Sequence, residues 1–225
     1  MKIYVVGSSK NKFLPLDNIR EKFLIDQKHE GDNIDFLNPW YCEMTGLYYL
    51  WKHCDDDIVG LEHYRRYFVN KNNENMTEEK INKILTTFDI ILNKYDFIEK
   101  DHMYKWNLKQ NRMSEFNKIF TIIKTYDTKL ASYCLEYQKT KKYCYEGNMF
   151  IGHKKIIDEY CNFIFEILDL YIKAEKHFNK KLIPRICGYL AEYIFGAWCE
   201  YKNLKIFAAK RRLYDRNLIK YTLGK

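Results

Sequence analysis

The chain has 225 residues, of which 47% are apolar and 30% charged, so it can bury a sizeable core and is not mainly disordered. Its nine Gly and three Pro exclude collagen-like and low-complexity architectures. The formal charge is +8, but residues 201–225 hold eight Lys or Arg against one Asp and so carry +7 of it, which leaves the preceding body nearly neutral.

Short apolar strands alternate with helices along the chain. Lys2–Gly7 is a β-branched run that ends in a polar Gly-Ser-Ser loop, and residues 11–37 are irregular and polar. Asn38-Pro39 is typical of a helix start. The expected strands are 2–7, 58–61, 88–92 and 147–152, and the expected helices are 38–53, 77–87, 113–140, 154–175 and 184–200. This alternation predicts one α/β domain with a mostly parallel sheet.

The strongest local signal is the polar segment Glu62–Tyr67 (EHYRRY), which directly follows the buried strand 58–61. Ligands of open α/β sheets bind beyond the carboxyl ends of such strands. Arg presents a fork of donors that matches phosphate oxygens, so Arg65 and Arg66 indicate a diphosphate ligand. A solvated strand end with surface arginines is the alternative.

Three further clusters leave alternatives open. Asn148 stands at the start of a predicted buried strand, where it either contacts a ligand or is an ordinary turn residue. Arg185 and Glu192 are two helical turns apart, and Glu192 stands in an apolar run, so it is either structurally paired or a base with a shifted pKa. Asp55–Asp57 precedes a strand rather than following it, which favours a solvated turn over a metal site.

Cysteine usage and hydropathy indicate the compartment. The seven Cys include no Cys-x-x-Cys pair and are typical of a reducing environment. The start of the chain is too short an apolar run for a signal peptide, and no stretch has the roughly 18 apolar residues of a membrane span. We therefore expect a cytoplasmic protein. The basic segment 204–225 predicts either attachment to an anionic membrane surface or a helix packed on the domain.

Four segments stand out in combination. They are NPWYCEMTGLY at 38–48, DIVGLEHYRRYF at 57–68, NMFI at 148–151 with DEYC at 158–161, and RICGYLAE at 185–192. Together, and in this order, they resemble the bacterial family of capsular or exopolysaccharide biosynthesis glycosyltransferases, long carried as a domain of unknown function. The resemblance spans residues 2–203, and the chain is short between 95 and 145, where the family commonly has more residues.

The resemblance implies a GT-A-like nucleotide-sugar-binding domain over residues 1–203, followed by a basic tail over 204–225. It implies transfer of a sugar from a nucleoside diphosphate donor, a UDP-sugar, to a lipid-linked or oligosaccharide acceptor in capsule, exopolysaccharide or O-antigen synthesis. Many such enzymes hold a divalent metal with Asp-x-Asp after a central strand, where this chain has Glu62–Arg66 instead. Mn²⁺ or Mg²⁺ is therefore not favoured as a cofactor.

On this hypothesis Glu192 is the general base of an inverting displacement and His63 is the second catalytic residue, with Glu43 or Glu62 next in line as the base. The expected substrate-binding residues fall into groups by ligand part: Gly7, Ser8, Asp32 and Asn33 for the nucleoside, His63, Arg65 and Arg66 for the diphosphate, Tyr64 to stack on the donor or hydrogen-bond to it, Asn148 for the donor sugar or acceptor, and Arg185. The alternatives are a non-catalytic partner in a polysaccharide assembly complex and a basic nucleic-acid-binding module. The second lacks any recognised motif, so nucleic acid is not an expected partner.

Overall fold

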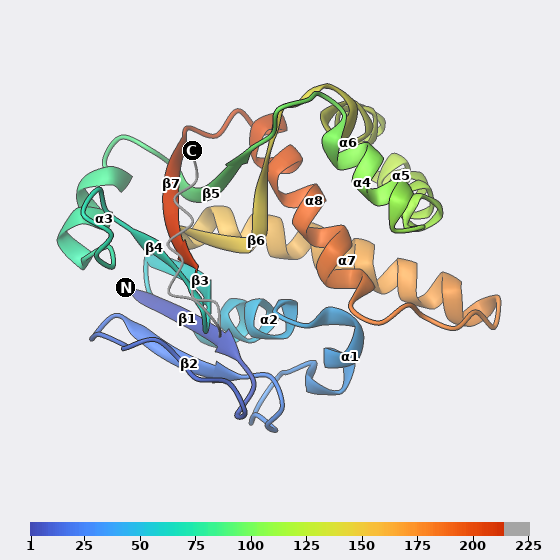
Figure 1. The fold of residues 1–225 in the computed structure, drawn as a ribbon. Helices are drawn as coiled ribbons and strands as arrows, with labels where there is room; N and C mark the ends of the chain where they lie inside the picture. Colours follow the sequence, from blue (N-terminus) through green and yellow to red (C-terminus); the bar gives the residue numbers. More distant parts are fainter. Residues whose placement is uncertain (214–225) are drawn as a thin grey trace.

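A seven-stranded sheet forms one part of the molecule, beside a cluster of helices (Figure 1), in a computed structural model that describes residues 1–213. The strands are β1 Lys2–Gly7, β2 Arg20–Leu24, β3 Ile58–His63, β4 Arg66–Val69, β5 Ile90–Asp96, β6 Tyr143–His153 and β7 Ile206–Leu213. Their order is β2-β1-β3-β4-β7-β5-β6, and a further pairing between β3 and β6 closes five of them into a small barrel-like ring.

The sheet is mixed, so the prediction of a mostly parallel sheet was wrong. Pairs β1–β2, β1–β3 and β5–β7 are parallel, whereas β3–β4, β3–β6, β4–β7 and β5–β6 are antiparallel. The reason is local at β3 and β4, because His63 pairs with Arg66 across a two-residue turn. Such a short connection can only join antiparallel strands.

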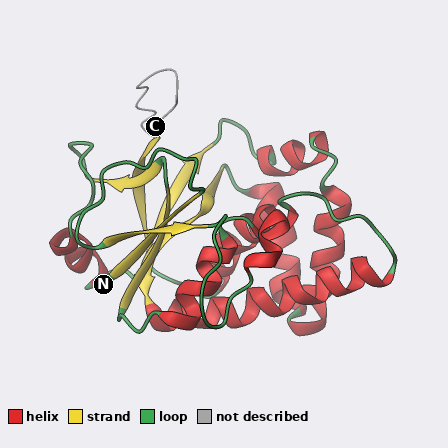
Figure 2. Ribbon diagram, turned by 90° about the horizontal axis from the view of Figure 1, so that it is seen from below, coloured by secondary structure: helices red, strands yellow, loops and turns green. Residues whose placement is uncertain are grey.

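Most of the helices gather on one side of the sheet (Figure 2). They are η1 Asp35–Leu37, α1 Asn38–Tyr41, α2 Met44–His53, α3 Glu78–Leu85, α4 His102–Lys109, α5 Met113–Tyr126, α6 Thr128–Thr140, α7 Lys154–His177 and α8 Ile186–Tyr201. The main core lies between the sheet and α2, α5, α6, α7 and α8. The short helix α3 belongs to a second core cluster, in which Ile81 and Ile84 join Ile91 and Ile151. None of the helices within residues 1–213 is long and apolar enough to cross a membrane.

Two helices that the sequence predicts as continuous are broken. The first stops at Cys42, which has a left-handed φ of 52°, and resumes as α2. The second is divided at Asp127, which is extended and whose carboxylate accepts from the backbone N of Lys129 and Leu130. Asp127 is thereby the N-cap of α6. The first of these breaks shapes the candidate site.

The expected basic tail differs from the structure over its first part. Ile206–Leu213 forms β7, which is parallel to β5 and antiparallel to β4 within the sheet. The domain therefore continues past residue 203, because β7 fills the gap between β4 and β5. The remainder of the predicted tail, 214–225, lies outside the described residues.

Candidate active site

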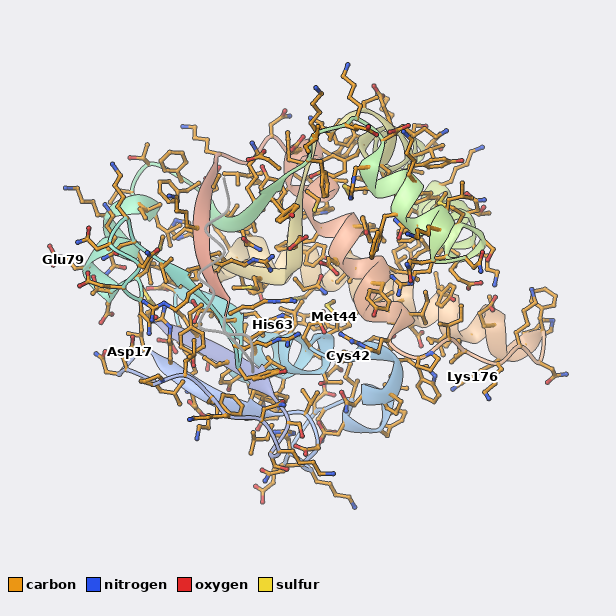
Figure 3. The ribbon with its side chains drawn as sticks, in the orientation of Figure 1. Asp17, Cys42, Met44, His63, Glu79 and Lys176 are labelled. Carbon is orange, nitrogen blue, oxygen red and sulfur yellow. The ribbon has the colours of Figure 1, made fainter. Side chains whose placement is uncertain are left out.

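A cavity of about 650 Å³ opens where β1 and β3 end. Its sheet side consists of these strand ends, the β3–β4 turn and part of β6, and its helix side of the break between α1 and α2 and the start of α8. His63 and Cys42, both labelled in Figure 3, come from these two sides. The carboxyl ends of sheet strands are where α/β proteins commonly bind ligands.

The β3–β4 turn presents its side chains to the cavity because it packs against a glycine. A Cβ on Gly7 would lie 2.8 Å from Tyr64 Cβ, so glycine permits a close approach that a larger residue would prevent. The Tyr64 backbone N donates to Val6 O over 2.9 Å and fixes the turn. Tyr64, Arg65 and Arg66 all line the cavity as a result.

Arg66 brings an incompletely satisfied guanidinium to this wall. Within the described residues its Nε is buried and has no hydrogen-bond partner. Burial, together with the charges of Arg211 and Arg65, lowers the pKa of Arg66. Arg211 itself is paired with Glu146, Nη2 to Oε2 at 2.5 Å. The charges of Glu192 and Glu146 act the other way. An anion bound in the cavity would add a charge-assisted contact to the Arg66 guanidinium and favour its charged form.

The start of α8 adds a second source of positive potential. Arg185 precedes the helix with a φ of 64°, and its backbone N donates to Pro39 O at 2.9 Å, which brings the helix start against the break after α1. Arg185, Gly188 and Tyr189 line the cavity. Backbone N–H groups in the first turn of a helix have no partner within the helix and favour anions.

A bulge in β6 connects the two predicted acid–base residues. Gly147 has a φ of 79°, and the pairing of β6 with β5 shifts register at this point. The Gly147 backbone N donates to Glu192 Oε1 at 2.6 Å, and its carbonyl O accepts from His63 Nε2 at 2.6 Å. One residue therefore orients both side chains.

The surroundings shift the pKa values of both side chains toward neutral forms. Burial, with the charges of Glu43 and Glu146, raises the pKa of Glu192 to about 7. Burial lowers the pKa of His63 to about 4. Because a carbonyl only accepts, the neutral His63 ring carries its proton on Nε2 and leaves Nδ1 as an acceptor. Near neutral pH, Glu192 therefore populates both its protonated and its ionised form, as a general acid or base must.

The structure gathers seven of the predicted site residues and leaves four, Ser8, Asp32, Asn33 and Asn148, outside the cavity lining. Those that line the cavity are Gly7, His63, Tyr64, Arg65, Arg66, Arg185 and Glu192. Ser8 lies next to it but donates to Asp26, Oγ to Oδ2 at 2.7 Å. Asp32 accepts from the Tyr48 hydroxyl, and Asn33 binds backbone oxygens of its own loop. Ser8, Asp32 and Asn33 therefore stabilise loops and are absent from the cavity lining.

Asn148 supports the site from behind the cavity wall. It is buried, with a φ of 51°, and its Nδ2 donates to Glu43 Oε1 at 2.8 Å and to Gly188 O at 3.0 Å. Glu43 lines the cavity at the start of α2. Sequence analysis considered Glu43 only as an alternative base. Its hydrogen bond with Asn148 joins residues 105 positions apart, so no pattern in the neighbouring sequence could predict it.

Glu62, the other reserve base, is engaged elsewhere. It is fully buried and accepts from Arg20 Nε at 2.7 Å, from Arg20 Nη2 at 3.1 Å and from the Phe68 backbone N at 2.9 Å. Arg20 also donates to Asp17 Oδ2 at 2.6 Å. The acid of the EHYRRY segment thus ties β2, β3 and β4 together.

Among residues 1–213, no three His, Cys, Asp or Glu side chains gather as a metal ion would require. In the Asp55–Asp57 turn, Asp56 accepts from the N-terminal amine at 2.5 Å.

Residues 2–203 match the family described as a domain of unknown function, DUF4422, and the chain belongs to that family. The predicted family resemblance is thereby confirmed. The fold is similar to that of the solved structure titled "WbbM bifunctional glycosytransferase apo structure", with a TM-score of 0.77 and 21% sequence identity. The match covers 96% of this chain and 45% of that chain, so this chain corresponds to less than half of the larger protein. No curated protein matches the sequence.

Proposed function

We propose that this chain is a glycosyltransferase that moves a sugar from a nucleoside diphosphate donor to a growing glycan. One observation carries the proposal: a single cavity is lined by Arg65, Arg66 and Arg185 and by a buried carboxylate, Glu192, whose pKa is raised to about 7. Such a reaction needs the first to hold the leaving diphosphate and the second to take a proton from the acceptor. The fold similarity to a bifunctional glycosyltransferase supports the proposal.

In the proposed reaction, Glu192 Oε2 removes the proton of an acceptor hydroxyl, and the acceptor oxygen attacks the anomeric carbon of the donor. The bond between that carbon and the diphosphate oxygen breaks in line, so that the configuration inverts and the nucleoside diphosphate leaves with the electron pair. Arg65 and Arg66 neutralise the charge that develops on it. His63 is a positioning residue, which holds Gly147 and through it Glu192.

The finer assignments follow the family resemblance. Gly7, where β1 meets the cavity, is proposed to seat the nucleoside of a UDP-sugar in a GT-A-like arrangement. The acceptor is proposed to be a lipid-linked or oligosaccharide precursor of capsule, exopolysaccharide or O-antigen. Free cysteines throughout the described chain support a cytoplasmic location, and the basic residues after 203 support contact with the inner face of the membrane.

Titration calorimetry with uridine, UMP, UDP, GDP and ADP tests the proposal. We expect a nucleoside diphosphate to bind at least tenfold more tightly than the matching monophosphate, because the second phosphate adds charge-assisted contacts. Absence of binding by every diphosphate at millimolar concentration would overturn the donor assignment. Release of UDP from UDP-sugars, measured with and without glycan acceptors, then distinguishes an enzyme from a non-catalytic partner that only retains the fold.

A further inference from the structure

A second, smaller pocket of about 210 Å³ adjoins the cavity described above. The two share Glu146 and Glu192, so these carboxylates stand on the boundary between them. The smaller pocket lies between the end of β5, helix α4, part of β6 and α8. A group bound there would lie beside Glu192.

Aromatic rings dominate the wall of this pocket. They are those of Tyr95, Phe97, His102, Trp106, Tyr145 and Tyr193. Phe97 stacks on His102 with ring centroids 4.3 Å apart and packs against Tyr95 at 5.4 Å. Trp106 is 47% exposed and Tyr95 41% exposed, although both belong to a pocket wall. Large rings left open to solvent at the rim of a pocket indicate a ligand with a flat apolar face.

The two pockets differ in charge, so they favour ligands of different chemistry. No Lys or Arg is among the described residues that line the smaller pocket, whereas Arg65, Arg66 and Arg185 line the larger one. A phosphate therefore has no partner in the smaller pocket. A purely apolar chain is also disfavoured, because it would cover the two carboxylates without offering them a hydrogen bond. A sugar ring meets both demands, since it presents an apolar face and hydroxyl donors.

We infer that this aromatic pocket, formed by Tyr95, Phe97, Trp106 and Tyr193 beside Glu192, binds the terminal sugar of the acceptor glycan. The inference rests on the proposed function and extends it by naming where the acceptor lies. The ring would stack on the aromatic wall and direct one hydroxyl toward Glu192. The boundary position of Glu192 then explains how one carboxylate can serve a donor on one side and an acceptor on the other.

Fluorine NMR of 5-fluorotryptophan-labelled protein tests this directly, with methyl glycosides of the common hexoses as probes and UDP present. We expect at least one glycoside to shift the resonance that disappears in Trp106→Phe. Tyr95→Ala should weaken the binding of that glycoside by about two- to tenfold, which is the effect expected from the loss of one ring contact. Leu108→Ala is the matched control, because Leu108 is 56% exposed on the same helix and does not line the pocket.

The results distinguish the two levels of the proposal. If UDP binds but no glycoside shifts the Trp106 resonance, or if Tyr95→Ala and Leu108→Ala behave alike, the acceptor pocket is overturned and the donor site stands. If no nucleoside diphosphate binds while a glycoside still shifts that resonance, the pocket stands as a sugar site and the donor assignment fails.

Discussion

Two buried glutamates lie near the end of β3 and have opposite surroundings. Glu62 accepts three hydrogen bonds, two from Arg20 and one from a backbone amide, and has no access to the cavity. Within residues 1–213, Glu192 accepts one hydrogen bond, from the Gly147 backbone N, and it lines the cavity. Burial, together with the charges of Glu43 and Glu146, raises the pKa of Glu192, although the charge of Arg66 acts the other way.

The comparison shows that burial alone does not mark a working carboxylate. A buried acid whose oxygens are all engaged by a cation is a structural ion pair, and breaking it leaves an uncompensated charge. A buried acid beside like charges, with an oxygen free toward a cavity, is held near the point of protonation and can exchange a proton. Four sets of experiments test this contrast and the site around Glu192.

Glu62→Gln should have the largest effect on stability. It removes the negative charge but leaves Arg20 buried, so we expect a loss of about 3–5 kcal/mol in the free energy of unfolding. Urea unfolding followed by circular dichroism measures this. Glu21→Gln is the control, because Glu21 makes only an exposed ion pair with Lys2 on the neighbouring strands. Equal stability of the two variants would show that the Arg20–Glu62 pair does not hold β2 and β3 together.

Arg66→Ala and Arg65→Ala should each weaken nucleoside diphosphate binding by about 1.5–3 kcal/mol, the value of a charge-assisted hydrogen bond. Lysine at either position should restore only part of this, because it lacks the planar fork. Calorimetry with UDP measures the change, with Lys80→Ala on α3 as a control cation outside the cavity. Unchanged affinity in both alanine variants would remove the diphosphate from this wall.

Glu192→Gln should stabilise the protein at alkaline pH. The pKa of Glu192 is about 7 when folded against 4.5 as its ordinary value, so the folded state holds the proton more tightly. This contribution to stability is complete below pH 4.5 and is lost as the pH rises through 7. We therefore expect the free energy of unfolding of the Glu192→Gln variant to exceed that of the wild type by about 1–3 kcal/mol at pH 8. This difference should disappear near pH 4. A Gln variant that is less stable at pH 8 would indicate a structural role.

EDTA should have the smallest effect. Because arginines rather than an Asp-x-Asp stand after β3, we expect most of the transfer activity to persist after dialysis against the chelator. The initial rate of UDP release, before and after dialysis, checks this. Complete loss that Mn²⁺ or Mg²⁺ restores would mean that carboxylates such as Glu43 hold a metal.

The sequence predicted the strand-end part of the site and, at α8, Arg185 and Glu192, but it missed the long-range contacts that join these parts, for physical reasons. Apolar β-branched runs identify β1 and β3, and the polar segment that follows β3 has a local signal. The partners of Asn148 are 105 and 40 residues away, and the bulge at Gly147 depends on pairing with β5, so neither leaves a mark in nearby residues. Strand β7 was hidden by its charge, since Arg211 reads as part of a basic tail until its pairing with Glu146 is known.

The role of Glu192 as general base is tested most directly by the rate of sugar transfer of the Glu192→Gln variant, measured at saturating donor together with its affinity for UDP. Gln keeps the shape of the side chain and can accept from Gly147, but it cannot take a proton. We predict UDP affinity close to that of the wild type and turnover lower by about 10²–10⁴-fold, with the wild-type rate falling as the pH drops below about 7. A folded Glu192→Gln protein that transfers sugar at the wild-type rate would contradict the account.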